Sequence, residues 1–225
     1  MHRLFFLLCL TVGLANCETA EQVESSTEAT DSVAETGVET PETNHNWQAI
    51  DSEEALVATA LLAAPEASRE GAKVIGYNTA GEFVTLREGT NEFICLADDP
   101  NTEGFNAACY HKDLEPFMAR GRELRAAGRN NQEIFDIREE EAKSGKLTMG
   151  EMGTTLHIYS GPEARYDPAT GRVDQAKYRY VVYLPFATAA STGLPESPVA
   201  PNHPWIMDPG THRAHIMISP INGEE

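Results

Sequence analysis

The sequence predicts a single α+β domain, in which a mostly antiparallel sheet carries an N-terminal helix and two inserted helices. The chain has 225 residues, of which 41% are hydrophobic and 23% charged, a composition typical of globular proteins. Apolar residues recur at helical spacing in three segments and alternate with polar residues in several shorter ones. The helices and strands come in blocks rather than in alternation, so a parallel nucleotide-binding sheet is disfavoured.

The chain begins with features of an export signal. An apolar run fills residues 4–15 and is too short to cross a bilayer as a helix, which needs about 20 apolar residues. Residues 1–16 are therefore predicted to be a signal peptide. The residues at its end resemble a bacterial lipoprotein signal: Leu14-Ala15-Asn16-Cys17. The resemblance implies cleavage before Cys17 and attachment of lipid to its thiol, with ordinary cleavage after Ala15 as the alternative.

This resemblance implies an exported protein of the cell envelope that meets the membrane only through its lipid anchor. Glu18 stands where inner-membrane lipoproteins often carry Asp, so the implied location is the outer membrane. Residues 17–46 are predicted to be an acidic, disordered tether, because 18–46 hold eight acidic residues, no basic residue and few large apolar ones. The globular domain is then expected to span residues 47–225.

The predicted domain is itself acidic. Of the 35 Asp and Glu and the 17 Lys and Arg of the chain, 27 and 16 lie in residues 47–225, a formal charge of about −11. Non-specific affinity for nucleic acids comes mainly from Lys and Arg that neutralise phosphates, so no nucleic-acid partner is expected. An anionic bilayer surface is disfavoured for the same reason.

The first half of the domain is predicted to contain one helix and three strands. The helix covers residues 52–64, with Asp51 as its cap and Glu54 three residues later. Pro65 opens one further helical turn, which Gly71 ends. Three strands follow, the first two joined as a hairpin by a turn at residues 78–81: 73–77, 82–87 and 93–96.

The second half is predicted to contain two helices and three strands. Asp113 is expected to cap a helix that runs to Gly128, and Asn130 with Glu133 to cap a second one that runs to Gly145. The strands that close the domain are expected at residues 154–159, 178–184 and 213–218. A loop at residues 187–209 is too long for a plain connector and is expected to be functional or packed on the domain.

Four segments carry a resemblance at the level of the whole domain. They are the hairpin at 74–86, the helix end Lys143-Ser144-Gly145, the turn at 167–171 and the strand at 178–184. Together they resemble an extracytoplasmic Cache or PAS-like domain in pattern over residues 50–220. The resemblance implies that the domain binds a small ligand, without naming it.

Two cysteines, Cys95 and Cys109, lie in the predicted domain. In an exported chain such a pair is expected to form a disulfide. The short loop that it closes would contribute on the order of 3 kcal/mol to stability. A redox or metal-binding pair would favour Cys-x-x-Cys spacing, which is absent.

The last three predicted strands offer a candidate ligand site. If they are neighbours, alternation gathers polar side chains on one face, which the helix around Phe117 and the loop at 187–209 would close. Arg binds carboxylates bidentately and Tyr combines apolar area with a polar tip, so a small polar or carboxylate ligand is expected. A plain solvated face is the alternative. The predicted ligand-binding residues are His157, Tyr159, Arg179, Tyr183, Arg213 and His215.

An extracytoplasmic hydrolase or metal-dependent enzyme is the alternative function, with His157, His212 and His215 as its candidate residues. No metal ligand is assigned, because His-Glu-x-x-His and Cys-x-x-Cys motifs are absent. Gly-x-Ser-x-Gly is absent too, and Ser191 with Asp208 and a downstream histidine is the one triad that can be assembled. No cofactor is expected, since no phosphate loop or dinucleotide fingerprint occurs.

Four arginines lie within ten residues of the first inserted helix: Arg120, Arg122, Arg125 and Arg129. Three of them share a helical face near its end, where they complement the helix dipole. The alternative role is docking to an acidic partner, such as a cell-envelope protein. Binding is favoured over catalysis, because no catalytic constellation has a supporting motif.

Overall fold

The computed structural model describes residues 45–220, so the predicted signal peptide, Cys17 and nearly all of the tether lie outside the described part. The strands of the main sheet, in spatial order, are β10 (Trp205–Met207), β11 (His215–Ile218), β9 (Lys177–Tyr183), β6 (Thr155–Gly161), β5 (Phe105–His111), β4 (Phe93–Leu96), β2 (Lys73–Tyr77) and β3 (Phe83–Arg87). A smaller sheet contains β1 (Gln48–Ala49), β7 (Arg165–Asp167) and β8 (Arg172–Val173). The helices are α1 (Glu53–Leu62), α2 (Glu115–Ala126), α3 (Asn131–Lys143) and α4 (Ala189–Thr192), with 3₁₀ turns η1 (Glu66–Ser68) and η2 (Lys112–Leu114).

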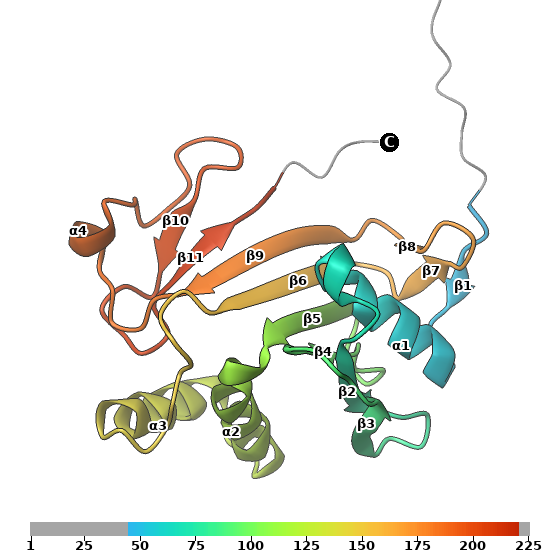
Figure 1. The fold of residues 1–225 in the computed structure, drawn as a ribbon, viewed down its shortest axis with the longest axis horizontal. Helices are drawn as coiled ribbons and strands as arrows, with labels where there is room; N and C mark the ends of the chain where they lie inside the picture. The colour runs from blue at the N-terminus through green and yellow to red at the C-terminus, as the bar shows by residue number, and fades with distance from the viewer. Residues whose placement is uncertain (1–44, 221–225) are drawn as a thin grey trace, which may run out of the picture. The chain divides into compact units, whose positions relative to one another are not determined.

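The main sheet is antiparallel at every described pair of neighbours except β2 and β4, which run parallel. The α+β class and the mostly antiparallel sheet predicted from the sequence are confirmed. Helix α1 covers one face of the sheet, and α2 and α3 lie on the other (Figure 1). Each face therefore has its own core, with the central strands β5 and β6 contributing to both.

The core under α1 consists largely of small side chains. Ala60, Ala63 and Ala64 of the helix region pack on Val74 of β2 and on alternate residues of β5. Here Cys95 of β4 lies directly opposite Cys109 of β5, and the two form the predicted disulfide. Small residues let α1 lie close to the strands, and the disulfide joins two of those strands.

The core under α2 and α3 contains larger side chains. Tyr110 of β5, Leu156 of β6 and Val181 of β9 face Phe117 and Leu114 from the α2 region. Edge-to-face contact joins the rings of Phe117 and Tyr183, whose centroids are 5.7 Å apart. The described cavities that involve α2 lie on this side of the sheet.

Two of the predicted helix caps are wrong. Ser52, not Asp51, caps α1, since its Oγ accepts a hydrogen bond from the Ala55 amide at 3.1 Å and Asp51 lies one residue too early. Asp113 lies inside the turn η2 rather than at a cap, because the chain already turns at Lys112. The capping box of Asn130 and Glu133 on α3 is confirmed.

Strand β5, which lies between β6 and β4 near the centre of the main sheet, was not predicted from the sequence. Its low content of β-branched residues, with two alanines in the middle, hides it from a propensity argument. The predicted loop at 187–209 also contains regular structure, since α4 and the short strand β10 lie within it. Strands β5 and β10 therefore form because they pair with neighbouring strands of the sheet, and not because their residues have a high intrinsic strand propensity.

Candidate functional site

The six residues predicted to bind a ligand do not share one face of the sheet. On β6 and β9, His157 pairs with Tyr180, whereas Tyr183 of β9 pairs with His215 of β11. Because Tyr180 and Tyr183 are separated by three positions on one strand, the two pairs point to opposite faces. His157 and Tyr159 thus lie on the α1 side, and Arg179, Tyr183 and His215 on the α2/α3 side. The prediction that His157 of β6 and Tyr183 of β9 point to the same face of the sheet is therefore wrong.

His157 and Tyr159 belong to an aromatic row on the α1 side. The His157 ring contacts Phe93 and Tyr180, with centroids 6.0 and 5.2 Å away. Burial lowers the pKa of His157 and favours the neutral imidazole. Tyr159 is buried, stacks on Tyr178 and accepts a 3.4 Å hydrogen bond from the Val173 amide. These contacts are those of core residues.

The other face holds a cavity of about 230 Å³ between α2, α3 and the end of β9, which we call the arginine pocket. It brings together two of the six predicted residues, Tyr183 and Arg213, beneath the predicted Phe117 helix. Met118 of that helix also lines it. The remaining lining residues were not part of the predicted ligand site, although two of them come from the arginine cluster of α2: Leu96, Gly121, Arg122, Arg125, Ile134 and Arg138. Four of its ten lining residues are arginines and none is acidic.

A second, larger cavity of about 680 Å³ adjoins the arginine pocket, and we call it the α2 groove. The two cavities share the lining residues Leu96, Arg122 and Arg125, so they lie next to each other along α2. The α2 groove is lined by both apolar and acidic side chains: Tyr77, Phe83, Ala97, Ala119 and Ala126 with Asp98, Asp99, Glu103 and Glu123. The side chain of Phe83 is 42% exposed.

Arg138 on α3 is the most unusual charge in the arginine pocket. It is 9% exposed, and its guanidinium lies over the Phe117 ring with Cζ 4.0 Å from the centroid. Its Nη1 donates to the Phe117 carbonyl at 3.3 Å, but Nε has no hydrogen-bond partner. Burial, together with Arg213 and Arg125 nearby, lowers the pKa of Arg138 to about 10, so it stays protonated at neutral pH.

The remaining arginines of the pocket are only partly neutralised. Arg122 pairs with Glu115 at 2.6 Å, and Arg213 pairs with Asp208 at 2.7 Å. Arg125 is exposed, and its Nη2 donates a long hydrogen bond of 3.5 Å to Asn131 Oδ1. The pocket therefore combines one buried charge without a carboxylate partner and one exposed charge in the same condition.

The predicted docking face formed by Arg122, Arg125 and Arg129 is not a free surface. Arg129 lies beyond the end of α2 and pairs with Glu133 at 3.1 Å, while Arg122 turns to Glu115. Two of these arginines therefore form ion pairs within the domain, in addition to their expected interaction with the dipole of α2. Among the three, Arg125 keeps its guanidinium available.

His212 is fully buried beside the arginine pocket. Its Nδ1 lies 2.5 Å from Glu139 Oε2, and its backbone amide donates to the same oxygen at 2.7 Å. Burial opposes ionisation of Glu139, but hydrogen bonds from Lys143 and His212 outweigh it and lower the pKa of Glu139 to about 2. Burial also lowers the pKa of His212, since its Nε2 has no partner and faces aromatic rings.

The residues of the alternative enzyme function do not converge. His157 lies on the opposite face from His215, and His212 is enclosed by Phe117 and Phe135. Ser191 closes the capping box of α4, because its Oγ accepts a hydrogen bond from the Thr188 amide at 2.9 Å. Within residues 45–220, no group of three His, Cys, Asp or Glu side chains is arranged to hold a metal ion.

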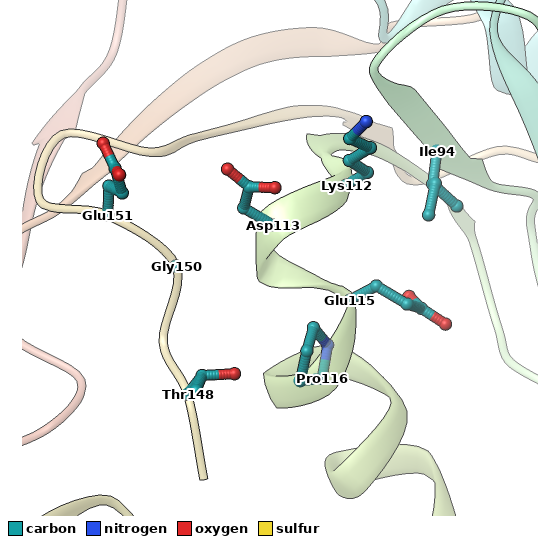
Figure 2. A pocket seen from close by; sticks show the side chains of 8 residues that line it. All are labelled: Ile94, Lys112, Asp113, Glu115, Pro116, Thr148, Gly150 and Glu151. Carbon is teal, nitrogen blue, oxygen red and sulfur yellow. The ribbon is translucent and has the colours of Figure 1, made fainter. Parts of the chain in front are cut away.

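A third depression lies where η2 meets the segment at 148–151 (Figure 2). Its cavity of about 640 Å³ is bordered by the carboxylates of Asp113 and Glu151 from facing segments, with Lys112 at its rim. Lys112 pairs with Glu92 at 2.6 Å, and Glu115 is held by Arg122. The depression therefore offers exposed carboxylates without a buried polar group aimed at a ligand.

Comparisons of the chain with protein-family models, with curated proteins and with solved structures found no match. In the described part of the chain, no helix has the length and apolar character needed to cross a membrane. The geometry of the arginine pocket and of the α2 groove is therefore the basis for assigning a function.

Proposed function

We propose that this protein is an exported, lipid-anchored binding domain whose small ligand occupies the α2 groove and the arginine pocket. The observation that carries the proposal is that these two cavities adjoin, with Leu96, Arg122 and Arg125 lining both. Ligand sites are typically concave and mostly apolar, with a few polar groups that fix orientation. The Cache- or PAS-like relationship and the anchor at Cys17 belong to the same proposal.

The lining of the α2 groove supports a ligand with an apolar part. Leu96 also lines the arginine pocket, and Tyr77 and Phe83 lie on either side of the turn that joins β2 and β3. The rings of Tyr77 and Phe83 meet edge to face at 5.3 Å. An apolar ligand segment on this surface would remove water from the exposed Phe83 ring, which favours binding by about 25 cal/mol per Å² of buried area.

A thermal-shift screen of carboxylates, amino acids, sugars and eight-carbon alkyl compounds tests the proposal. A ligand at a hundredfold excess over its Kd stabilises the folded state by about 2.7 kcal/mol. For a domain of this size that corresponds to a rise in Tm of roughly 5–10 °C.

The matched variants are Ala119→Trp, which fills the α2 groove, and Ala58→Trp, at an exposed position of α1. We expect the compound that shifts the wild type to shift Ala58→Trp equally and Ala119→Trp much less. A screen without any shift, or shifts that Ala119→Trp leaves unchanged, would contradict binding at this site.

A further inference from the structure

The arginine pocket contains a buried positive charge that the described protein does not neutralise. Arg138 is 9% exposed, no described carboxylate lies within ion-pair distance of it, and its Nε lacks a hydrogen-bond partner. A buried charge without a partner is costly, and buried Arg is normally paired. In a domain with a formal charge of about −11 and many carboxylates, this arrangement calls for an explanation.

Helix α2 is shaped to receive the Arg138 guanidinium. Gly121 lies in the interior of α2, and a Cβ built there would come within 2.9 Å of Arg138 Nη1. Glycine in a helix interior costs about 1 kcal/mol relative to alanine. The ring of Phe117, one turn earlier, supports the other side of the guanidinium. The seat of Arg138 is thus built by two residues of α2, one of which lowers helix stability.

The lining of the cavity around Arg138 adds further positive charge. Arg125 and Arg213, which both line it, disfavour the protonated form of Arg138. Glu141 favours that form, but it is not part of the cavity lining and is itself paired with Arg120 at 2.7 Å. Tyr183 lies beside them, and burial raises the pKa of its phenol, which therefore stays neutral. The pocket presents fixed guanidinium donors and one phenol, the donor set that binds an oxyanion in bidentate fashion.

We infer that the arginine pocket holds the oxyanion head group of an amphipathic ligand, with Arg138 as its anchor, while the apolar body lies in the α2 groove. The inference rests on the proposed function and narrows it to one ligand class, an apolar chain that ends in a carboxylate or another oxyanion. The anion would be the negatively charged partner that Arg138 lacks within the described part of the protein. The shared residues Leu96 and Arg125 mark where head group and body meet.

Calorimetric titration of the protein with octanoate and with octanol tests the inference. The two probes have alkyl chains of the same length and differ in the charge of the head group. We expect octanoate to bind the wild type at least tenfold more tightly than octanol. Arg138→Met should bring octanoate down to the level of octanol, and Arg138→Lys should keep part of the preference because the charge remains but the fork is lost. Arg129→Met, which removes an exposed arginine outside both cavities, serves as the control.

Gly121→Ala provides a second variant that does not depend on the folding of Arg138→Met. Its new Cβ should displace the guanidinium and reduce the octanoate preference, while the helix gains propensity. Acetate and inorganic phosphate, titrated alone, show whether the head group suffices without a chain. Binding of these ions as tight as that of octanoate would overturn the amphipathic class.

The outcomes separate the inference from the proposed function. Equal affinity for octanoate and octanol in the wild type would overturn the inference and leave the proposed function standing. An octanoate preference that survives in both Arg138→Met and Gly121→Ala would overturn the role of Arg138. Failure of both probes to bind at millimolar concentration would overturn the inference; the proposed function would fall with it only if the wider screen also found no ligand.

Discussion

The two faces of the main sheet differ in how they treat polar groups. On the α1 face, small apolar residues and the disulfide Cys95–Cys109 form a core in which the buried Thr59 hydroxyl donates to the Ala55 carbonyl at 2.7 Å. On the α2/α3 face lie the two buried side-chain atoms that lack a partner in the described part of the chain, Arg138 Nε and His212 Nε2. The side-chain hydroxyl on the first face is satisfied, whereas the second face contains two unsatisfied atoms, one of which belongs to Arg138 in the lining of the arginine pocket.

This difference indicates that the α1 face contributes mainly to stability and the α2/α3 face mainly to ligand binding. Loss of a buried side chain from the α1 face removes packing that nothing replaces, whereas loss of Arg138 removes an uncompensated charge. Mutations on the two faces should therefore have different consequences for stability and for ligand binding. The following predictions start with the largest expected effect.

Leu56→Ala should cost the most stability. Leu56 on α1 is 3% exposed within the core of the α1 face, and truncating such a leucine typically costs about 2–5 kcal/mol because it leaves a cavity. Urea denaturation measures the loss. Octanoate affinity of the folded fraction should be that of the wild type, and a parallel loss of affinity would show that the two faces are not independent.

Removal of the disulfide by a Cys95→Ala, Cys109→Ala double variant should lower stability by about 3 kcal/mol, the contribution of a loop of this length. In thermal unfolding this corresponds to roughly 6–12 °C. Reduction of the wild type should produce a similar decrease. A change below about 1 kcal/mol in both experiments would mean that the packing under α1 holds the strands without the covalent link.

Acidification should lower the free energy of unfolding through His212 and Glu139 on the α2/α3 side of the sheet. Burial lowers the pKa of His212 below its ordinary value of 6.5, so below that pH the unfolded chain takes up a proton that the folded chain does not. Stability therefore falls as the pH decreases through about 6.5, and falls again as the pH approaches the lowered pKa of Glu139, about 2. Thermal unfolding at several pH values checks this.

The variant that isolates this contribution is His212→Gln. We expect its stability to depend less on pH near neutrality than that of the wild type. A wild-type domain whose Tm rises on acidification from pH 7 to 5 would contradict the assignment of a neutral His212.

Much of the fold could be predicted from local patterns. The hairpin of β2 and β3 follows from two alternating runs around a turn, and α3 from the reciprocal cap of Asn130 and Glu133. Strand β5 could not, because its small residues carry little strand propensity and its position depends on contacts with β4 and β6. The phase of β6 relative to β9 is likewise set by pairing along the whole sheet, so His157 and Tyr183 were wrongly placed together.

The candidate site was only partly accessible from the sequence. Tyr183, Arg213 and the Phe117 helix were expected near a pocket, and they line the arginine pocket. Arg138 was missed, although one signal was present, since it follows the buried Ile134 by four residues and so lies on the apolar stripe of α3. An arginine on such a stripe, opposite a glycine in a neighbouring helix, is a pattern that a search of the sequence could use.

The most direct test of the division between the two faces is the Tm of wild type and Arg138→Met, each with and without octanoate. The account predicts that the variant without ligand melts at or above the wild-type temperature, because an unpaired buried charge has been removed, and that octanoate raises the Tm of the wild type alone. A variant that melts several degrees lower and still responds fully to octanoate would contradict it, and would make Arg138 a structural residue like Leu56.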